Sequence, residues 1–412
     1  MSASPELVLL TAEYPFGNRS EPFLETEIEV LAERFRRIYV LPSHRRDGIR
    51  SMPANVELVE MDWLEEPARR AKQAALASRE AARVLRWTLR TPGDIGPQLA
   101  SRLYLDILAR NILKLRSLRR FVQERHLGNA IFYDYWFENS TLALALLRES
   151  NTIGTAVARA HGFDVYEERW DGGPVPFRQA KAKGLDMVFA VSRAGLRYLD
   201  DRVPGLREKV TVQPLGVRDP GPVSPEQIDT TPLIVTCGNL IPIKRVHLVP
   251  EVLTRLGRPV RWVHLGDGPE RSRVETAISR DGDENQWTLR GHVDNREVLC
   301  FYSRNHVSAL LSLSESEGLP VSMMEAQSYG IPVVACAVGG VPEIVDDRTG
   351  ILLDPHASPS AIAEGLEAAL EPGRFDRTVV HELFRDRFDA GSNYNAFADA
   401  LIELHERRAP AV

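Results

Sequence analysis

Short apolar runs alternate with helical stretches twice along this chain of 412 residues, on either side of a proline-rich segment. The first series has apolar runs at 6–11, 37–42, 130–136, 155–161 and 186–192. The second has them at 232–239, 261–268, 287–293, 307–315, 331–338 and 350–355. Parallel strands need long crossovers, usually helices, so this alternation is typical of parallel α/β sheets. The chain therefore predicts two doubly wound domains, with ligands at the carboxyl ends of the strands.

The segment 214–232 marks the expected boundary between the two domains. It contains five prolines and two glycines, a composition that favours a stiff, extended connection crossed by few contacts. We therefore predict an N-terminal domain at 1–222 and a C-terminal domain at 223–390. The tail, at 391–412, has the apolar spacing of an amphipathic helix.

Several classes of protein are disfavoured by the sequence. The three cysteines have no zinc or redox spacing, which suits a reducing compartment. The start of the chain has no basic leader, and no apolar run reaches about 18 residues. Nucleotide P-loops, metalloprotease motifs and carboxylate clusters for a metal are also missing. We expect a cytoplasmic protein that binds neither a metal nor another cofactor.

Charge is distributed unevenly along the chain. Between Glu66 and Arg125 there are 14 Lys or Arg and 5 Asp or Glu, although the whole chain has a net charge of −6. The stretch 66–125 also has apolar residues near helical spacing. One interpretation is a solvated helical insertion. The other is a peripheral contact with the anionic inner face of a membrane. Nucleic acid is not an expected partner, because the rest of the chain is acidic.

The segment 312–355 concentrates the residues that suggest chemistry. Gly318 allows a tight turn, Pro320 suits the first turn of a helix, and Gly330 ends that helix. Glu317 lies just before the predicted helix and Glu325 lies inside it. Amide groups at such a helix start attract anions or sugar hydroxyls. By spacing alone, however, two solvated glutamates would be the commoner interpretation.

The residues around this pair resemble a known family. EGLP at 317–320, EA at 325–326, GIPVVA at 330–335 and GGVPEIV at 339–345 look like the donor-site signature of bacterial retaining glycosyltransferases of family four. CGNLIPIKR at 237–245, RGHV at 290–293 and HGFD at 161–164 also fit, in the same order. The resemblance implies the GT-B fold, in which two Rossmann-like domains face a cleft and the C-terminal helix returns to the first domain.

The resemblance also implies a donor site for a nucleotide-diphosphate sugar, such as a UDP- or GDP-sugar. Lys244 would compensate the charge of the leaving diphosphate. Family members often have Arg at the position of Asn239 and Gly at that of Arg245, so the clamp expected here is Lys244 with Arg245. Glu325 would accept hydrogen bonds from the ribose, and Glu317 from the transferred sugar. The other residues expected to bind the donor are Gly17, Asn18, Asn239, Arg290, His292, Gly318 and Leu319.

For the first domain, the resemblance implies that His161 faces the donor sugar and, with Lys244 and Glu317, forms the catalytic set. A lone histidine is more often structural, and His292 is nearly as well explained as a surface side chain. Asp164 either contacts the acceptor or caps a helix. Trp136 and Glu138 would supply stacking and polar contacts to the acceptor, with a core position as the alternative for the aromatic ring.

The expected function is transfer of a sugar, with retention, to a glycan, a lipid-linked glycan or a small molecule during cell-surface polysaccharide or glycoconjugate synthesis. A donor phosphate oxygen is expected to take the acceptor proton, because no separate general base is evident. Two alternatives stay open. A GT-B sugar-nucleotide epimerase would convert the donor without an acceptor, and a non-catalytic nucleotide-sugar or glycan-binding protein would bind without turnover.

Overall fold

The computed structural model describes residues 4–17, 21–65, 67–89, 102–138, 140–170, 175–222, 231–281 and 286–408. The chain forms two compact units. Unit 1 comprises Met1–Pro214 together with Tyr394–Val412, and unit 2 comprises Leu215–Asn393. The sequence-based division lies at 222/223 and 390/391.

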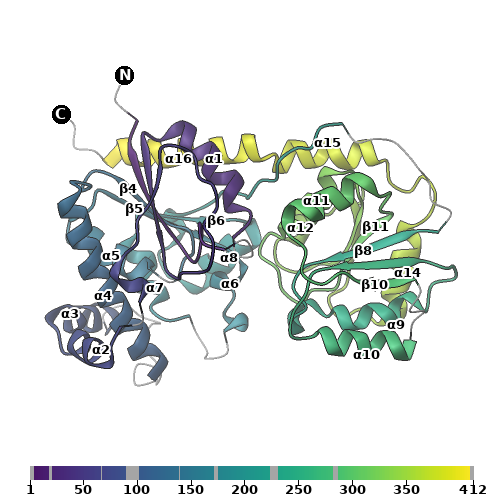
Figure 1. Cartoon of the computed structure of the whole chain (residues 1–412), viewed down its shortest axis with the longest axis horizontal. Helices are drawn as coiled ribbons and strands as arrows, with labels where there is room; N and C mark the ends of the chain where they lie inside the picture. The colour runs from purple at the N-terminus through teal and green to yellow at the C-terminus, as the bar shows by residue number, and fades with distance from the viewer. Residues whose placement is uncertain are drawn as a thin grey trace. The chain divides into compact units, whose positions relative to one another are not determined.

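Unit 1 is built on a seven-stranded parallel sheet with the order β3-β2-β1-β4-β5-β6-β7 (Figure 1). The strands are β1 (Glu6–Thr11), β2 (Arg37–Pro42), β3 (Val56–Leu58), β4 (Ile131–Asp134), β5 (Thr155–Ala160), β6 (Met187–Ala190) and β7 (Val210–Val212).

Helices cover both faces of this sheet because side chains alternate between the faces along each strand. Leu7 and Leu9 pack with α1 and α16, whereas Val8 and Leu10 pack with α4, α5 and α7. The helices of unit 1 are α1 (Leu24–Arg34), α2 (Arg69–Leu76), α3 (Arg79–Leu89), α4 (Arg102–Glu124), α5 (Thr141–Glu149), α6 (Gly162–Val165), α7 (Arg178–Gly184), α8 (Arg193–Arg202) and most of α16 (Ala390–Arg408).

The C-terminal helix is part of the unit 1 core. Phe397, Ala398 and Leu401 of α16 are fully buried against the face that carries Leu7 and Leu9. The Arg159 guanidinium, buried in an ion pair with Glu27, lies 4.0 Å from the centre of the Phe397 ring. The expected return of this helix to the first domain is therefore confirmed.

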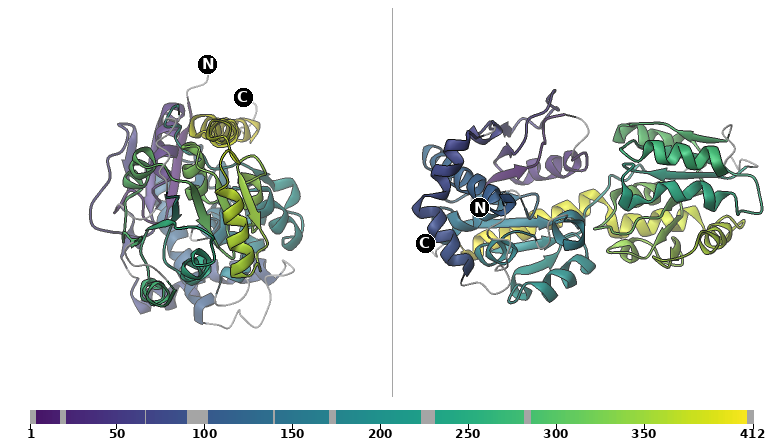
Figure 2. Two further views of the ribbon diagram at one scale, coloured as in Figure 1. Left: turned by 90° about the vertical axis from the view of Figure 1, so that its right-hand side faces the viewer. Right: turned by 90° about the horizontal axis from the view of Figure 1, so that it is seen from below.

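Unit 2 is built on a six-stranded parallel sheet with the order β10-β9-β8-β11-β12-β13. Helices flank both faces of this sheet as well, as two further views show (Figure 2). Its strands are β8 (Leu233–Cys237), β9 (Arg261–Leu265), β10 (Trp287–Leu289), β11 (Ala309–Ser312), β12 (Val333–Cys336) and β13 (Gly350–Leu353). Its helices are α9 (Val249–Leu253), α10 (Arg271–Asp281), α11 (Asn295–Arg304), α12 (Val321–Ser328), α13 (Val341–Ile344), α14 (Pro359–Ala369) and α15 (Arg377–Phe388).

The basic stretch forms α2, α3 and α4 where it is described. The apolar residues of α4 pack in the unit 1 core, whereas Arg116 and Arg120 are exposed and form ion pairs with Glu80 and Asp62. Among the described residues, no helix is both long enough and apolar enough to cross a membrane.

Candidate functional site

In each sheet the strand order reverses its direction between two neighbouring central strands. In unit 2 this occurs between β8 and β11, and in unit 1 between β1 and β4. Loops at the carboxyl ends of such strand pairs separate to opposite sides and leave room for a ligand. These two places are therefore where functional side chains are expected.

In unit 2, the loops after β8 and β11 bring Lys244 and Glu317 together. The Glu315 amide donates a hydrogen bond to the Ile243 carbonyl at 2.9 Å, which fastens one loop to the other. Lys244 Nζ then donates to Glu317 Oε1 at 2.5 Å. The side chains are 22% and 8% exposed, so the pair is largely withdrawn from water while the lysine stays accessible. The structure thus places a fixed cation at the strand ends.

Glu325 lies in α12, the helix that follows this loop. Pro320 is the N-cap of the helix rather than part of its first turn. The Glu325 carboxylate is buried, and Asn295 Nδ2, from the start of α11, donates to its Oε1 at 2.5 Å. Burial raises the pKa of Glu325 to about 7, and the bond from Asn295 lowers it in part. A hydroxyl of a bound ligand would supply the stabilisation that this carboxylate lacks.

The Arg245 side chain forms hydrogen bonds within the fold of unit 2. Its backbone has a φ of +49°, and its guanidinium donates to the carbonyls of Leu313 at 2.6 Å and Pro355 at 3.1 Å. It also reaches Cys336 Sγ at 3.4 Å and pairs with Glu315 at 3.7 Å. These contacts give Arg245 a structural role that the sequence did not indicate. They leave Lys244 as the better candidate for a diphosphate cation.

The other donor-site candidates of unit 2 lie on the same edge of the sheet with fewer contacts. Asn239 is exposed in the loop after β8. Gly318 accepts a backbone bond from Gly340 at 3.0 Å, and Leu319 is buried. Arg290 and His292 are exposed; Arg290 lies 5.8 Å from the Phe301 ring centre, and His292 Nε2 lies 3.3 Å from Asp294. Their roles stay predictions.

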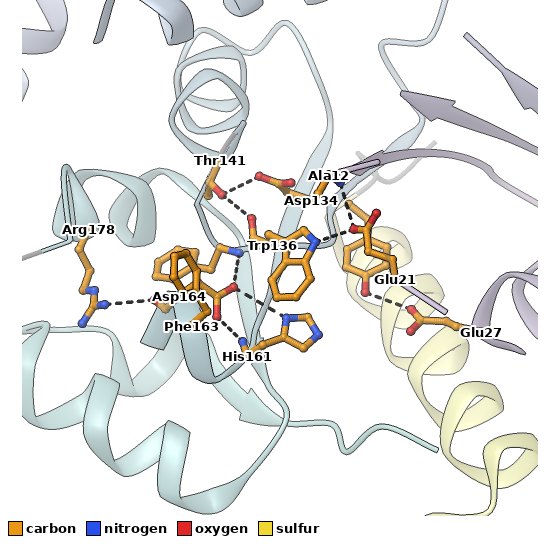
Figure 3. A network of polar contacts seen from close by, with 12 residues as sticks. Ala12, Glu21, Glu27, Asp134, Trp136, Thr141, His161, Phe163, Asp164 and Arg178 are labelled. Atoms are coloured by element: carbon orange, nitrogen blue, oxygen red, sulfur yellow. Dashed lines mark hydrogen bonds and ion pairs between the residues drawn. The ribbon is translucent and has the colours of Figure 1, made fainter. Parts of the chain in front are cut away.

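In unit 1, Trp136 connects the loops after β1 and β4 (Figure 3). Its indole Nε1 donates to Glu21 Oε1 at 2.5 Å. The same buried carboxylate accepts bonds from the amides of Ala12, Glu13 and Tyr14, at 2.7–3.0 Å. Glu21 therefore holds the first loop and the tryptophan in one arrangement.

His161 follows β5 and lies beside Trp136 (Figure 3). Its ring centre is 4.5 Å from that of Trp136 and 4.8 Å from that of Tyr135. The imidazole is 8% exposed, its Nδ1 lies 3.8 Å from Asp164 Oδ2, and Nε2 has no hydrogen-bond partner among the described residues. Buried polar groups are rarely left without partners, so Nε2 favours contact with a ligand.

Asp164 organises the loop that carries His161. It is fully buried, and its carboxylate accepts bonds from the backbone amides of His161 and, at 2.8 Å, Phe137. The N-cap residue of α6 is His161 rather than Asp164, but Asp164 still takes part in capping the helix, because its bond from the His161 amide belongs to a capping box. Glu138 is half-buried nearby, and burial raises its pKa.

The candidates in the first loop have separate outcomes. Gly17 has a φ of +64°, and its carbonyl accepts a bond from Arg50 Nε at 2.5 Å. Asn18 lies outside the described residues.

The partners Glu21 and Asn295 were missed by the sequence analysis, because they act on residues far away in the chain and no local spacing identifies them.

Comparison with known proteins agrees with this arrangement. The family described as "Glycosyl transferases group 1" matches residues 223–380. The putative colanic acid biosynthesis glycosyltransferase WcaL of Escherichia coli K12 is 30% identical over 280 residues, which cover 65% of this chain and 68% of that protein. Further relatives align over only 27–56% of their own lengths.

Two solved structures share the fold. The apo lipopolysaccharide outer core galactosyltransferase WaaB has a TM-score of 0.70 at 14% identity, over 97% of this chain and 99% of that one. Anabaena HepE in complex with UDP and glucose has a TM-score of 0.64 at 15% identity, over 96% and 99%. The expected two-domain α/β architecture of the GT-B type is confirmed. Among the described residues, no group of three His, Cys, Asp or Glu side chains is placed to hold a metal ion.

Proposed function

This chain belongs to the glycosyl transferases group 1 family, and from that premise we propose that it transfers a sugar from a nucleotide-diphosphate sugar to a glycan acceptor during polysaccharide synthesis. The observation that carries the proposal is the Lys244–Glu317 pair at the carboxyl ends of β8 and β11. Ligands of open α/β sheets bind at the carboxyl ends of the strands where the order reverses, and this pair lies there. A leaving diphosphate needs a fixed cation at such a place.

In this proposal unit 2 holds the donor. Lys244 compensates the charge that grows on the diphosphate as the glycosidic bond breaks. Glu317, its partner in the unliganded protein, accepts hydrogen bonds from hydroxyl groups of the transferred sugar. Glu325 accepts hydrogen bonds from the ribose hydroxyls, and Asn295 orients its carboxylate. The complex of HepE with UDP and glucose supports a donor of this class, and the name of WcaL supports a polysaccharide product.

We further propose that transfer retains the anomeric configuration. The bond to the diphosphate breaks, the sugar becomes oxocarbenium-like, and the acceptor hydroxyl attacks from the face that the diphosphate leaves. The acceptor proton passes to a phosphate oxygen of the leaving group. His161 lines the reacting sugar and, with Trp136, excludes water from it. The fixed charge of Lys244 accelerates the reaction because it stabilises the transition state more than the ground state.

The test begins with the purified chain and a thermal-shift screen of UDP-, GDP- and ADP-sugars. Binding at a hundredfold excess over Kd raises the free energy of unfolding by about 2.7 kcal/mol. The stabilising donor is then incubated with glycan acceptors, and the anomeric configuration of the product is read by NMR. An inverted product contradicts the mechanism. Donor conversion without an acceptor would indicate an epimerase, and binding without any turnover would indicate a binding protein.

A further inference from the structure

Unit 1 contains a pocket of about 590 Å³ that none of the proposed donor residues lines. It is lined by residues of α4 and by residues 43–44, 62–64, 67, 71, 138, 170, 176 and 181. Pockets that bind small molecules usually measure about 300–1,000 Å³, so there is room for a sugar with one substituent. The lining includes Trp63, Asn111, Lys114, Glu138, Trp170 and Lys181.

Lys114 places a buried cation in this pocket. It is 8% exposed, and its Nζ donates to Ser43 Oγ at 3.0 Å and to Ser140 Oγ at 2.9 Å. Within the described part of the chain, no carboxylate lies within ion-pair distance of it. Burial lowers the pKa of Lys114 to about 8. The Trp63 ring centre lies 5.6 Å from Nζ, and the carboxyl groups of Asp134 and Glu138 act on Lys114 from beyond ion-pair distance. Because burial of an ammonium group is costly, an anion bound directly beside it would reduce the remaining cost.

The arginines of the pocket differ from Lys114. Arg110, Arg116 and Arg120 follow one another along α4, and they pair with Asp106, Glu80 and Asp62 respectively. Lys181, which is 1% exposed, is a second buried cation of the pocket. The lining carries five Lys or Arg side chains against the carboxylates of Asp62 and Glu138, so its charge is positive on balance. Asn111 is 2% exposed, and its Oδ1 has no hydrogen-bond partner among the described residues. That oxygen calls for a donor such as a hydroxyl group.

Two indole rings form part of the apolar lining of the pocket. Trp63 Nε1 donates to the Pro42 carbonyl at 2.8 Å, and Trp170 Nε1 donates to the Phe163 carbonyl at 3.2 Å. Because both N–H groups are used by the backbone, the rings offer a ligand mainly apolar surface. A buried cation, polar groups and two indoles together suit a carbohydrate that carries a negative charge.

The pocket shares its walls with the His161 loops. Glu138, which lines the pocket, follows Phe137, whose amide donates to Asp164 Oδ2 at 2.8 Å. Trp170 is tied to Phe163, in the helix that follows His161. Figure 3 shows Trp136, His161 and Asp164 in one polar network. A sugar in the pocket would thus lie against the loops that hold the proposed reaction centre of unit 1.

We propose that this pocket binds the acceptor through an anionic group, a carboxylate or a phosphate carried by a sugar, with Lys114 as its counterion. The proposal rests on the proposed function, because it names the chemistry of the acceptor. The anion has two chemical sources: an acidic sugar such as a uronate, or the phosphate that joins a glycan to a lipid carrier.

The test measures hydrogen exchange of the whole chain with five probes. These are D-glucuronate, glucose 6-phosphate, neutral glucose, polyprenyl phosphate in phosphatidylcholine vesicles, and phosphatidylglycerol vesicles without polyprenyl phosphate. We expect protection of 102–124 and 161–170 by at least one anionic probe and little by glucose. The effective probe identifies the source of the charge. Equal protection by glucose, or protection by none of the probes, overturns the proposal, as does protection by phosphatidylglycerol vesicles alone, which would assign this face to the membrane.

A pair of variants localises the effect. Lys114→Gln should lower the affinity for the anionic probe by about tenfold or more, since a charged hydrogen bond is lost. Lys183→Gln, an exposed lysine of α7, is the matched control and should change nothing. If Lys114→Gln does not fold, Trp170→Ala takes its place with the same expected direction. Nucleotide-sugar affinity is measured in parallel, because a failed pocket leaves it intact, whereas a failed functional proposal removes it.

Discussion

At the scale of single residues, the surroundings of Lys244 and Glu325 make the two charges behave differently. Lys244 is paired with Glu317 and partly exposed, so its charge is compensated in the unliganded protein. Glu325 is buried, with an amide rather than a cation as its hydrogen-bond partner. Lys244 is therefore suited to exchange its carboxylate partner for a phosphate. Glu325 is suited to respond to pH.

Replacing Lys244 by Ala should lower kcat by about 10²–10³, because comparable electrostatic groups contribute that much to the transition state. Lys244→Arg should recover part of the loss, since it keeps the charge but not the geometry. Steady-state kinetics with the donor found by the screen provides the measurement. The control is Arg280→Ala, an exposed residue near the end of α10, which parallel α/β topology places at the opposite edge of the sheet. Equal kinetics for Lys244→Ala and the control would remove Lys244 from the site.

Glu325 should make stability and nucleotide affinity change with pH in opposite directions. Its folded-state pKa, about 7, lies above the ordinary value of 4.5, so the protonated form stabilises the fold below pH 4.5 and this contribution is lost as the pH rises through 7. Relative to wild type, Glu325→Gln should gain roughly 2–3 kcal/mol of unfolding free energy between pH 5 and pH 8. Nucleotide affinity of the wild type should rise over the same interval. Denaturant unfolding and calorimetry at the two pH values measure both, and a pH-independent difference would refute the assignment.

The residues that could be predicted from the sequence are those whose motif is continuous. Lys244, Glu317 and Glu325 belong to short runs with recognisable neighbours. Glu21 could not be found in this way, because its bond to Trp136 joins residues 115 positions apart. The same holds for Arg245, whose bond to the Pro355 carbonyl spans 110 positions and depends on the packed sheet.

At the scale of elements, α4 has two surfaces with different tasks. Its apolar residues complete the core of unit 1, and its basic residues pair with acids or line the pocket. The sequence predicted helical structure here, but left open whether the apolar side met protein or membrane. Burial of most apolar residues in the core leaves a mainly charged surface, with Leu103 exposed, so we expect a membrane contact of α4 to depend chiefly on charge and to be sensitive to salt.

Two leucines of α4, one buried and one exposed, allow the contribution of each surface to stability to be measured. Leu118 is fully buried, so Leu118→Ala should lower the unfolding free energy by about 2–5 kcal/mol through lost burial and a cavity. Leu103 lies in the same helix but is 50% exposed, and Leu103→Ala should cost about 0.5 kcal/mol or less. Urea unfolding of both variants provides the comparison. Similar losses at the two positions would show that this face of α4 is not part of the core.

The strands that the sequence failed to predict are β3 and β7. Each has three residues and lies at an edge of the sheet of unit 1. The edge strand β10 is equally short but lies within the predicted run 287–293, whereas no such run was recognised at β3 or β7. Pairing with a longer neighbour determines the conformation of these two strands. The longer central strands were recognised because almost all of their residues are buried, as in β1 and β5.

At the scale of the whole molecule, the chain leaves unit 1 after Pro214 and returns to it at Tyr394. Unit 1 therefore contains both ends of the sequence, whereas unit 2 is continuous. This connectivity makes the C-terminal helix a structural element of the domain that was synthesised first. The sequence indicated an amphipathic tail, and its destination came from the family resemblance, because apolar spacing does not identify a partner.

Removing residues 394–412 should destabilise unit 1 and leave unit 2 folded. Tyr394, Phe397 and Leu401 are fully buried, and their loss would expose the face formed by Leu7 and Leu9. It would also remove the aromatic rings that surround the buried Arg159 guanidinium. Hydrogen exchange measured by mass spectrometry distinguishes the units, since peptides from β1, β5 and β6 should lose protection while those from β8, β11 and β12 keep it. A chain that ends at Arg408 is the control and should match the full chain. Equal loss in both units would mean that they fold as one cooperative body, and no loss in unit 1 would mean that α16 does not support its core.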